Sequence, residues 1–270
     1  MSDGFITAIS AVTNAIFLLA GIYVYLALVR QIIARPTVER ALEERTFGFP
    51  DVILAAILST LFLLNAATAV SHDGKMVLRT NDLIFNGLIS GAVFILIVAF
   101  LKIRGRDVNS LGGFSRLGFW RTFLTGTILI FAAYPFILLA DLVTQRVLGG
   151  ASSKQGIVEL FTNSQTLEQR VLIIVLATAV APIVEEFVFR FFLYGVLRRY
   201  VGRFAGLIIN AALFAAVHAH LPSAAPLFVL GACFTLAYEW SGSILVSMTM
   251  HSLFNAFSLI ALAFPELFPQ

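Results

Sequence analysis

Six polar side chains in the last third of the chain have the types and the spacing needed to hydrolyse a peptide bond. They fall in three apolar segments: Glu185, Glu186 and Arg190 in the first, His218 in the second, and His251 and Asn255 in the third. Residues four apart lie on one face of a helix. Three helices could therefore direct two carboxylates, two imidazoles and a carboxamide into one cavity.

Peptide hydrolysis without a nucleophilic side chain needs a base that activates water and donors that hold the developing oxyanion. A carboxylate with a partner imidazole supplies the first, and a second imidazole with a carboxamide supplies the second. Successive helix residues diverge by about 100°, so Glu185 and Glu186 cannot easily share one role. The spacing of Glu186 and Arg190 predicts an ion pair, which leaves Glu185 as the freer carboxylate and the expected base.

The composition indicates that these groups lie within a membrane. Hydrophobic residues make up 59% of the 270 residues and charged residues only 12%, which is typical of an integral membrane protein. Ionisable groups at membrane depth are costly and usually mark a functional site. The single cysteine, Cys233, excludes an intrachain disulfide and a cysteine-based metal cluster.

The hydropathy pattern predicts an all-α, polytopic bundle of about eight transmembrane helices in one integral membrane domain. Residues 1–145 would form the N-terminal transmembrane helices, and residues 146–270 the catalytic helical core. Of the last four runs, Pro226–Trp240 is the shortest. The eight apolar runs are 5–29, 51–70, 83–101, 119–143, 171–197, 204–221, 226–240 and 243–264.

The basic residues gather in three connecting segments, around Arg30–Arg45, Lys102–Arg121 and Arg198–Arg203. This distribution fits the positive-inside pattern rather than a nucleic-acid-binding face. It predicts that these segments face the cytoplasm and that both termini face away from it, in a cell inner or plasma membrane. Among the remaining polar residues, Asn210 is expected to bond between helices, and Glu239, beside Trp240, is expected at the membrane interface.

The three motifs together are similar to those of a known family. Glu185-Glu186-x-x-x-Arg190, Phe214-x-x-x-His218 and His251-x-x-x-Asn255 follow one another on successive apolar segments. This ordered set resembles the CPBP family, which comprises CAAX proteases and bacteriocin-processing enzymes, is also called the Abi family, and includes the Rce1-type prenyl-protein endopeptidases. The first four apolar runs carry no motif of this family.

The resemblance implies a glutamate intramembrane endopeptidase with a largely α-helical fold and no metal or other cofactor. Glu185 and His218 would activate the water, and His251 and Asn255 would form the oxyanion site. Glu186 and Arg190 would support Glu185 by orientation and pairing. The substrate would be a peptide or protein, lipidated or membrane-anchored, processed at a CAAX-type end, a leader or a C-terminal tail.

Two other functions fit the same residues. Two histidines and two glutamates could bind zinc, since a catalytic zinc site commonly has three protein ligands and a water, although the chain has no His-Glu-x-x-His motif. A transport or immunity protein could instead use the carboxylates as a proton or cation site. An inverted repeat, typical of many transporters, is not recognisable in the sequence.

Overall fold

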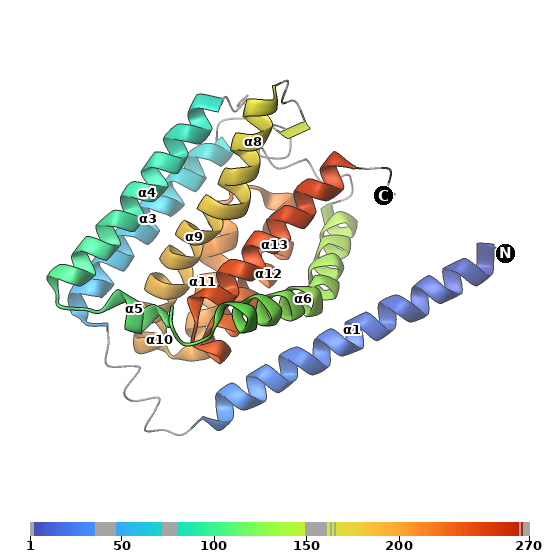
Figure 1. Cartoon of the computed structure of the whole chain (residues 1–270), viewed down its shortest axis with the longest axis horizontal. Coiled ribbons are helices and arrows are strands. Elements are labelled where there is room, and N and C mark those ends of the chain that lie inside the picture. Colours follow the sequence, from blue (N-terminus) through green and yellow to red (C-terminus); the bar gives the residue numbers. More distant parts are fainter. Residues whose placement is uncertain are drawn as a thin grey trace.

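The computed structural model describes residues 3–35, 47–71, 80–148, 161–162, 164, 166–264 and 266 (Figure 1). Every regular element within these ranges is a helix. The predicted all-α class is therefore confirmed. Much of the first basic segment, 36–46, lies outside the described residues.

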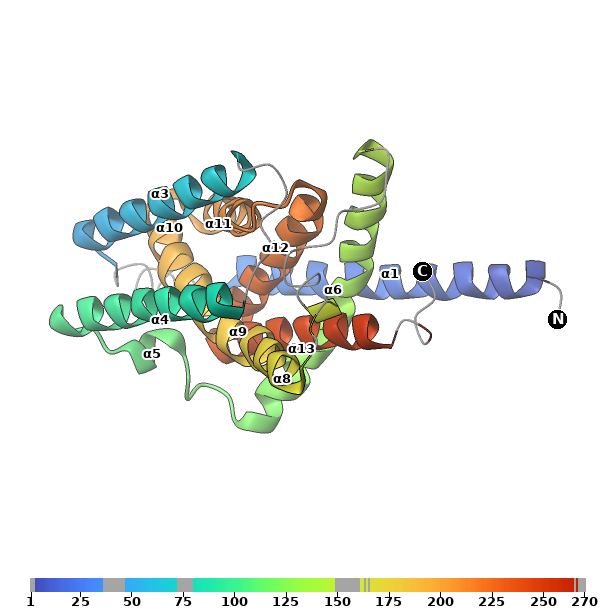
Figure 2. The same cartoon turned by 90° about the horizontal axis from the view of Figure 1, so that it is seen from above.

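Four long helices and one short helix make up the first half of the described chain: α1 (Asp3–Ala34), α3 (Phe49–Ser71), α4 (Thr80–Ile103), α5 (Val108–Gly112) and α6 (Phe119–Leu148). The long helices leave many large apolar side chains exposed, among them Leu61, Leu88 and Ile128. Such a surface is suited to lipid rather than water. Helix α6 bends visibly (Figures 1 and 2) and contains Pro135, which cannot donate a helical hydrogen bond.

The second half of the fold begins with one long helical stretch, Leu167–Val201. It consists of α8 (Leu167–Val175), the π-helical η1 (Leu176–Val180), α9 (Ala181–Glu186), the π-helical η2 (Phe187–Leu193) and α10 (Tyr194–Val201). Then follow α11 (Arg203–Val217), the 3-10 turn η3 (Leu221–Ser223), α12 (Ala224–Ser241) and α13 (Ile244–Ala263). In both views α9 passes between α4 and α13, which it contacts (Figures 1 and 2).

All eight predicted apolar runs are helical over most of their length, but seven helices within the described residues are long and apolar enough to cross a membrane. The exception is α11, with 15 residues, or about 22 Å at 1.5 Å per residue, against a hydrocarbon core of about 30 Å. It ends at Val217 because the chain turns through Ala219, which has a φ of 51°, ahead of Pro222. The short run at Pro226–Trp240 is extended in the structure, where η3 and α12 together span Leu221–Ser241.

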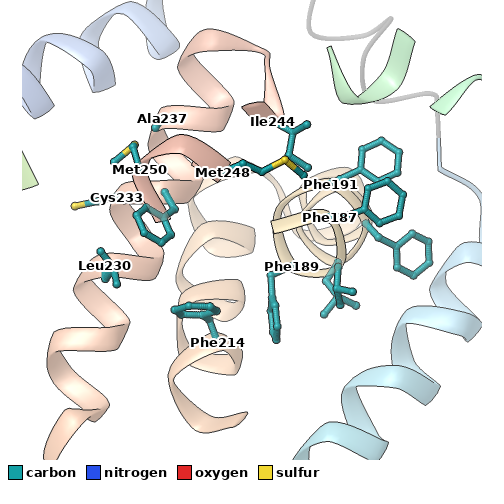
Figure 3. Packing of buried hydrophobic residues seen from close by; sticks show 14 of the residues in the cluster. Phe187, Phe189, Phe191, Phe214, Leu230, Cys233, Ala237, Ile244, Met248 and Met250 are labelled. Carbon is teal, nitrogen blue, oxygen red and sulfur yellow. The ribbon is translucent and has the colours of Figure 1, made fainter. Parts of the chain in front are cut away.

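The core is centred on the long helical stretch. All seven residues of η2 are buried, as expected for a segment that neighbouring helices surround. Phe187, Phe189 and Phe191 point outward from it in several directions, and Phe214 of α11 lies close to Phe189 (Figure 3). Because residues from both halves of the chain join this cluster, the N-terminal helices support the segment that carries the candidate site.

Candidate active site

The glutamate pair lies in a six-residue α-helix between two π-helical segments. Short π segments within α-helices are rare and occur often at functional sites. At η1 the sequence offers a cause, because Pro182 has no N–H group and its ring crowds the preceding turn. The helix accommodates this by widening just before the proline, and it continues unbroken to Val201.

The widened turn frees the carbonyl of Ala177. The N–H of Ala181, its ordinary partner, donates instead to the carbonyl of Leu176. The next residue, Pro182, has no N–H to offer. The side-chain amide of Asn255 supplies the missing donor, with Nδ2 2.7 Å from the Ala177 oxygen. Since an amide nitrogen carries two hydrogens, Asn255 is held in place and keeps a second N–H.

Glu186 is the acceptor of a fully buried network. Its Oε1 lies 2.9 Å from Nη1 of Arg190 and 2.9 Å from Nδ1 of His251. Glu186 and Arg190 have no exposed side-chain surface, and His251 has only 5%. The predicted pairing of Glu186 with Arg190 is thus present. The position of His251 in the same network was not expected from the sequence.

The guanidinium of Arg190 is enclosed by aromatic rings. It lies 4.1 Å from the ring centroid of Phe214 and 5.1 Å from that of Phe234, distances typical of cation–π contacts. Its Nη2 also lies 3.4 Å from the carbonyl oxygen of Gly231. A Cβ atom on Gly231 would lie only 3.3 Å from that Nη2, so the absence of a side chain at this position leaves room for the guanidinium.

Glu185 faces the other nitrogen of His251. Its Oε2 lies 3.9 Å from Nε2 of the imidazole, too far for a direct hydrogen bond but within reach of one bridging water. The side chain of Glu185 is 32% exposed, whereas that of Glu186 is fully buried. Among the described residues, none donates a hydrogen bond to the buried Oε2 of Glu185. Oε2 of Glu186 also lacks a donor among the described residues, so the difference between the two carboxylates is that Glu185 alone has a route to the surface.

His218 lies where α11 ends. Its Nδ1 lies 2.7 Å from the Phe214 carbonyl oxygen. A carbonyl only accepts, so Nδ1 carries the hydrogen and Nε2 is the basic nitrogen. The Phe214 ring centroid lies 4.8 Å from the ring of His218 and 6.0 Å from that of His251. Both imidazoles thus contact the same phenyl ring, and of the two, His251 is the one with a described contact to Glu185.

The sequence did not indicate that Phe214 does more than pack in the core. It is fully buried, yet its ring contacts Arg190, His218 and His251. Its spacing of four from His218 was the only signal in the sequence, and a chain with 26 phenylalanines makes that spacing uninformative.

A second buried polar cluster surrounds Glu239, which is 3% exposed; its expected place at the membrane interface stays a prediction. Its Oε2 accepts from the Tyr194 hydroxyl and from Nη1 of Arg198, each at 2.9 Å. Its Oε1 lies 3.2 Å from Nε of Arg203. Arg198 lies in α10 and Arg203 at the start of α11, and both reach Glu239 near the end of α12. The interhelical bond expected of Asn210 is present, from Nδ2 to Thr235 Oγ1 at 3.2 Å.

The described side chains do not form an evident metal centre. Within these ranges no group of three or more His, Cys, Asp or Glu residues is arranged to hold a metal ion. In the candidate site, the reason is that Oε1 of Glu186 is engaged by Arg190 and His251. His218 is bonded to the Phe214 carbonyl at the end of its own helix.

Comparison with known proteins supplies a family for this part of the chain. Residues 167–257 match the family described as type II CAAX prenyl endopeptidase Rce1-like. The chain contains an Rce1-like domain. No curated protein and no solved structure matches the chain. The Rce1-like domain begins with α8 and ends within α13, so it contains all six polar residues singled out in the sequence.

The match to a CAAX protease family over residues 167–257 and the seven apolar helices among the described residues indicate an integral, multi-pass membrane protein. The family implies a peptide or protein substrate. Thus the Rce1-like domain agrees with the resemblance carried by the three motifs.

Proposed function

We propose that the protein is an intramembrane glutamate endopeptidase in which Glu185 activates the attacking water. The observation that carries the proposal is the contact between Glu185 and His251. An uncommitted, buried carboxylate oxygen faces an imidazole nitrogen at 3.9 Å, in a domain of a protease family. One water can bridge these two atoms.

In the proposed reaction, the water oxygen attacks the scissile carbonyl carbon while Glu185 takes a proton from that water. Nε2 of His218 acts as the second base. The carbonyl oxygen becomes an oxyanion, bound by the second N–H of Asn255 and by His251 in its imidazolium form. Glu186, which accepts from Nδ1 of His251, stabilises that imidazolium. The C–N bond then breaks, and Glu185 returns the proton to the leaving amine.

Fixed roles for the supporting residues follow from their contacts. Glu186 and Arg190 position His251 rather than touch the substrate, and Ala177 positions Asn255. The proposal needs no metal or other cofactor. The substrate we propose is a membrane-anchored peptide end, of the CAAX type or a leader or C-terminal tail, in the cell inner or plasma membrane.

The decisive experiment compares Glu185→Gln with the unchanged protein in reconstituted membranes, using farnesylated CAAX peptides and unmodified tail peptides. General-base catalysis is worth roughly 10²–10⁴-fold, so we expect cleavage to fall by at least about a hundredfold while thermal unfolding stays unchanged. Undiminished cleavage by Glu185→Gln would remove the proposal.

A chelator separates this mechanism from zinc hydrolysis. We expect cleavage to persist after prolonged treatment with 1,10-phenanthroline. Loss of cleavage that is restored by added zinc, but not by calcium, would establish the metal-dependent alternative. Proton-coupled flux in liposomes without cleavage of either peptide class would instead establish transport.

A further inference from the structure

A cavity of about 460 Å³ lies apart from the candidate active site, where α1, α6 and α12 meet. It is bounded by the C-terminal ends of α1 and α12 and by the N-terminal part of α6, and none of the six motif residues lines it. The lining residues are Gln31, Arg35, Leu117, Arg121, Leu124, Thr125, Ile128, Trp240 and Ser241. Two of them are arginines, and none of the nine, all within described ranges, is acidic.

The first arginine is fixed at the end of a helix. Nη1 of Arg35 donates to the carbonyl of Glu239 at 2.8 Å, and Nη2 donates to the carbonyl of Trp240. These carbonyls carry the partial negative charge of the α12 C-terminus, which favours a cation there. The carboxylate of Glu239 is engaged by Arg198 and Arg203. Among the described residues no carboxylate pairs with Arg35, and its positive charge lines the cavity.

The second arginine belongs to a face of α6 that changes from polar to apolar along its length. Arg121 and Thr125 are four residues apart and share this face with Leu124 and Ile128. Arg121 is exposed, as are Leu124 at 56% and Ile128 at 59%. Ile128 lies about 10 Å farther along the helix axis than Arg121. A ligand here would meet a cation at its head and two apolar side chains below it.

The cavity also lies at a membrane interface. Trp240, whose Nε1 donates to Gln31 at 2.8 Å, is the kind of residue that gathers at headgroup level. Both arginines belong to the basic end of the molecule, the end expected to face the cytoplasm. Anionic lipids are concentrated in that leaflet, and basic pockets between helices on that side bind acidic headgroups.

We propose that this cavity binds an acidic phospholipid, with its phosphate on Arg35 and Arg121 and its acyl chains along Leu124 and Ile128. Thr125 adds a hydroxyl donor to the phosphate site. The bound lipid would fill the junction between α1 and the helices of the Rce1-like domain, so it would stabilise the packing of α1 against these helices. The inference does not depend on the proposed proteolytic mechanism.

Tryptophan fluorescence offers a direct test, because Trp240 lines the cavity and the chain has only two tryptophans. With Trp120→Phe as the background, Trp240 is the only reporter. The full chain is reconstituted in phosphatidylcholine nanodiscs that contain either brominated phosphatidylglycerol or brominated phosphatidylcholine of the same chain length. We expect brominated phosphatidylglycerol to quench Trp240 at a several-fold lower mole fraction of lipid than brominated phosphatidylcholine needs.

Substitutions then assign the preference to the cavity. Arg121→Gln should reduce the preference for the acidic lipid by roughly fivefold, the contribution of one basic residue at a membrane surface, and Arg121→Lys should retain most of it. Arg199→Gln removes an exposed arginine at the same end of the molecule but outside the cavity, so it should leave the preference unchanged. Circular dichroism checks that each variant keeps its helices.

Four outcomes would overturn the proposal, the last of them displacement by a soluble phosphate. The first is equal quenching by the two brominated lipids, and the second is an unchanged preference in Arg121→Gln. The third is displacement of brominated phosphatidylglycerol by a farnesylated peptide, which would make the cavity a substrate site. Soluble glycerol phosphate should not displace the lipid, because it lacks the acyl chains that contact α6, and displacement by it would show a simple anion site.

Discussion

The imidazole of His251 lies between the two adjacent glutamates, with Nδ1 2.9 Å from Oε1 of Glu186 and Nε2 3.9 Å from Oε2 of Glu185. Although consecutive helix residues point in different directions, this one ring reaches both carboxylates from α13. The arrangement divides the pair into a buried acceptor that fixes the ring and a partly exposed carboxylate left for water.

Glu186→Gln should destabilise the protein. The substitution removes the charge that compensates buried Arg190, and loss of one partner of a buried ion pair typically costs about 3–5 kcal/mol. We expect a marked fall in the thermal unfolding temperature together with loss of cleavage. Glu239→Gln is the matched control, a second buried carboxylate bonded to arginines, which should lower stability but leave cleavage by the folded protein largely intact. Unchanged unfolding of Glu186→Gln would contradict the network.

Substitution of the two histidines should affect activity in both cases but stability to different extents. His251→Ala leaves Glu186 without one of its two donors, so it should lower both cleavage and the unfolding temperature. The Nδ1 bond of His218 goes to the Phe214 carbonyl of its own helix, so it joins no second helix and no buried charge. His218→Ala should therefore abolish cleavage with a smaller stability loss, about 1 kcal/mol. Equal stability losses in the two variants, measured by thermal unfolding, would refute this distinction.

Gly231→Ala should weaken the fold through Arg190. An added methyl group would lie 3.1 Å from Cδ1 of Phe214 and 3.3 Å from Nη2 of Arg190. Overpacking of this kind costs about 1–3 kcal/mol. Gly91→Ala on α4 is the control, because nothing lies within 4 Å of its added methyl group, and alanine favours a helix by up to about 1 kcal/mol. In denaturation experiments Gly91→Ala should be the most stable protein, the unchanged protein should come next, and Gly231→Ala should be the least stable. A reversed order would be evidence against the guanidinium pocket.

Asn255→Ala should lower stability and activity for separate reasons. It leaves the buried carbonyl of Ala177 without a donor, at a cost of about 1–3 kcal/mol, and it removes a proposed oxyanion donor. Adding Pro182→Ala restores an N–H group to the helix. The double variant should therefore regain part of the lost stability but none of the lost cleavage. Recovery of cleavage in the double variant would show that Asn255 acts only by holding η1.

The extent of the helices could be predicted from composition, because an apolar run of about 20 residues has few alternatives to a helix in lipid. The position of their ends was less predictable. Helix α11 stops at Val217, four residues before its apolar run ends, because Ala219 adopts a left-handed conformation. The burial of Glu239 was not predictable because its arginine partners lie about 40 residues earlier in the sequence, and no local pattern reports such a contact.

The sequence by itself determined that the chain is a helical membrane protein, and it identified the six polar residues of the three motifs within its apolar runs. It also determined that Glu186 and Arg190 pair, since four-residue spacing within a helix fixes that contact. Only the tertiary structure decided that His251 joins them, that Asn255 bonds to the carbonyl of Ala177, and that Phe214 contacts both imidazoles. The physical reason is that helix periodicity fixes directions within one helix, whereas the rotation and depth of one helix against another depend on how their side chains pack.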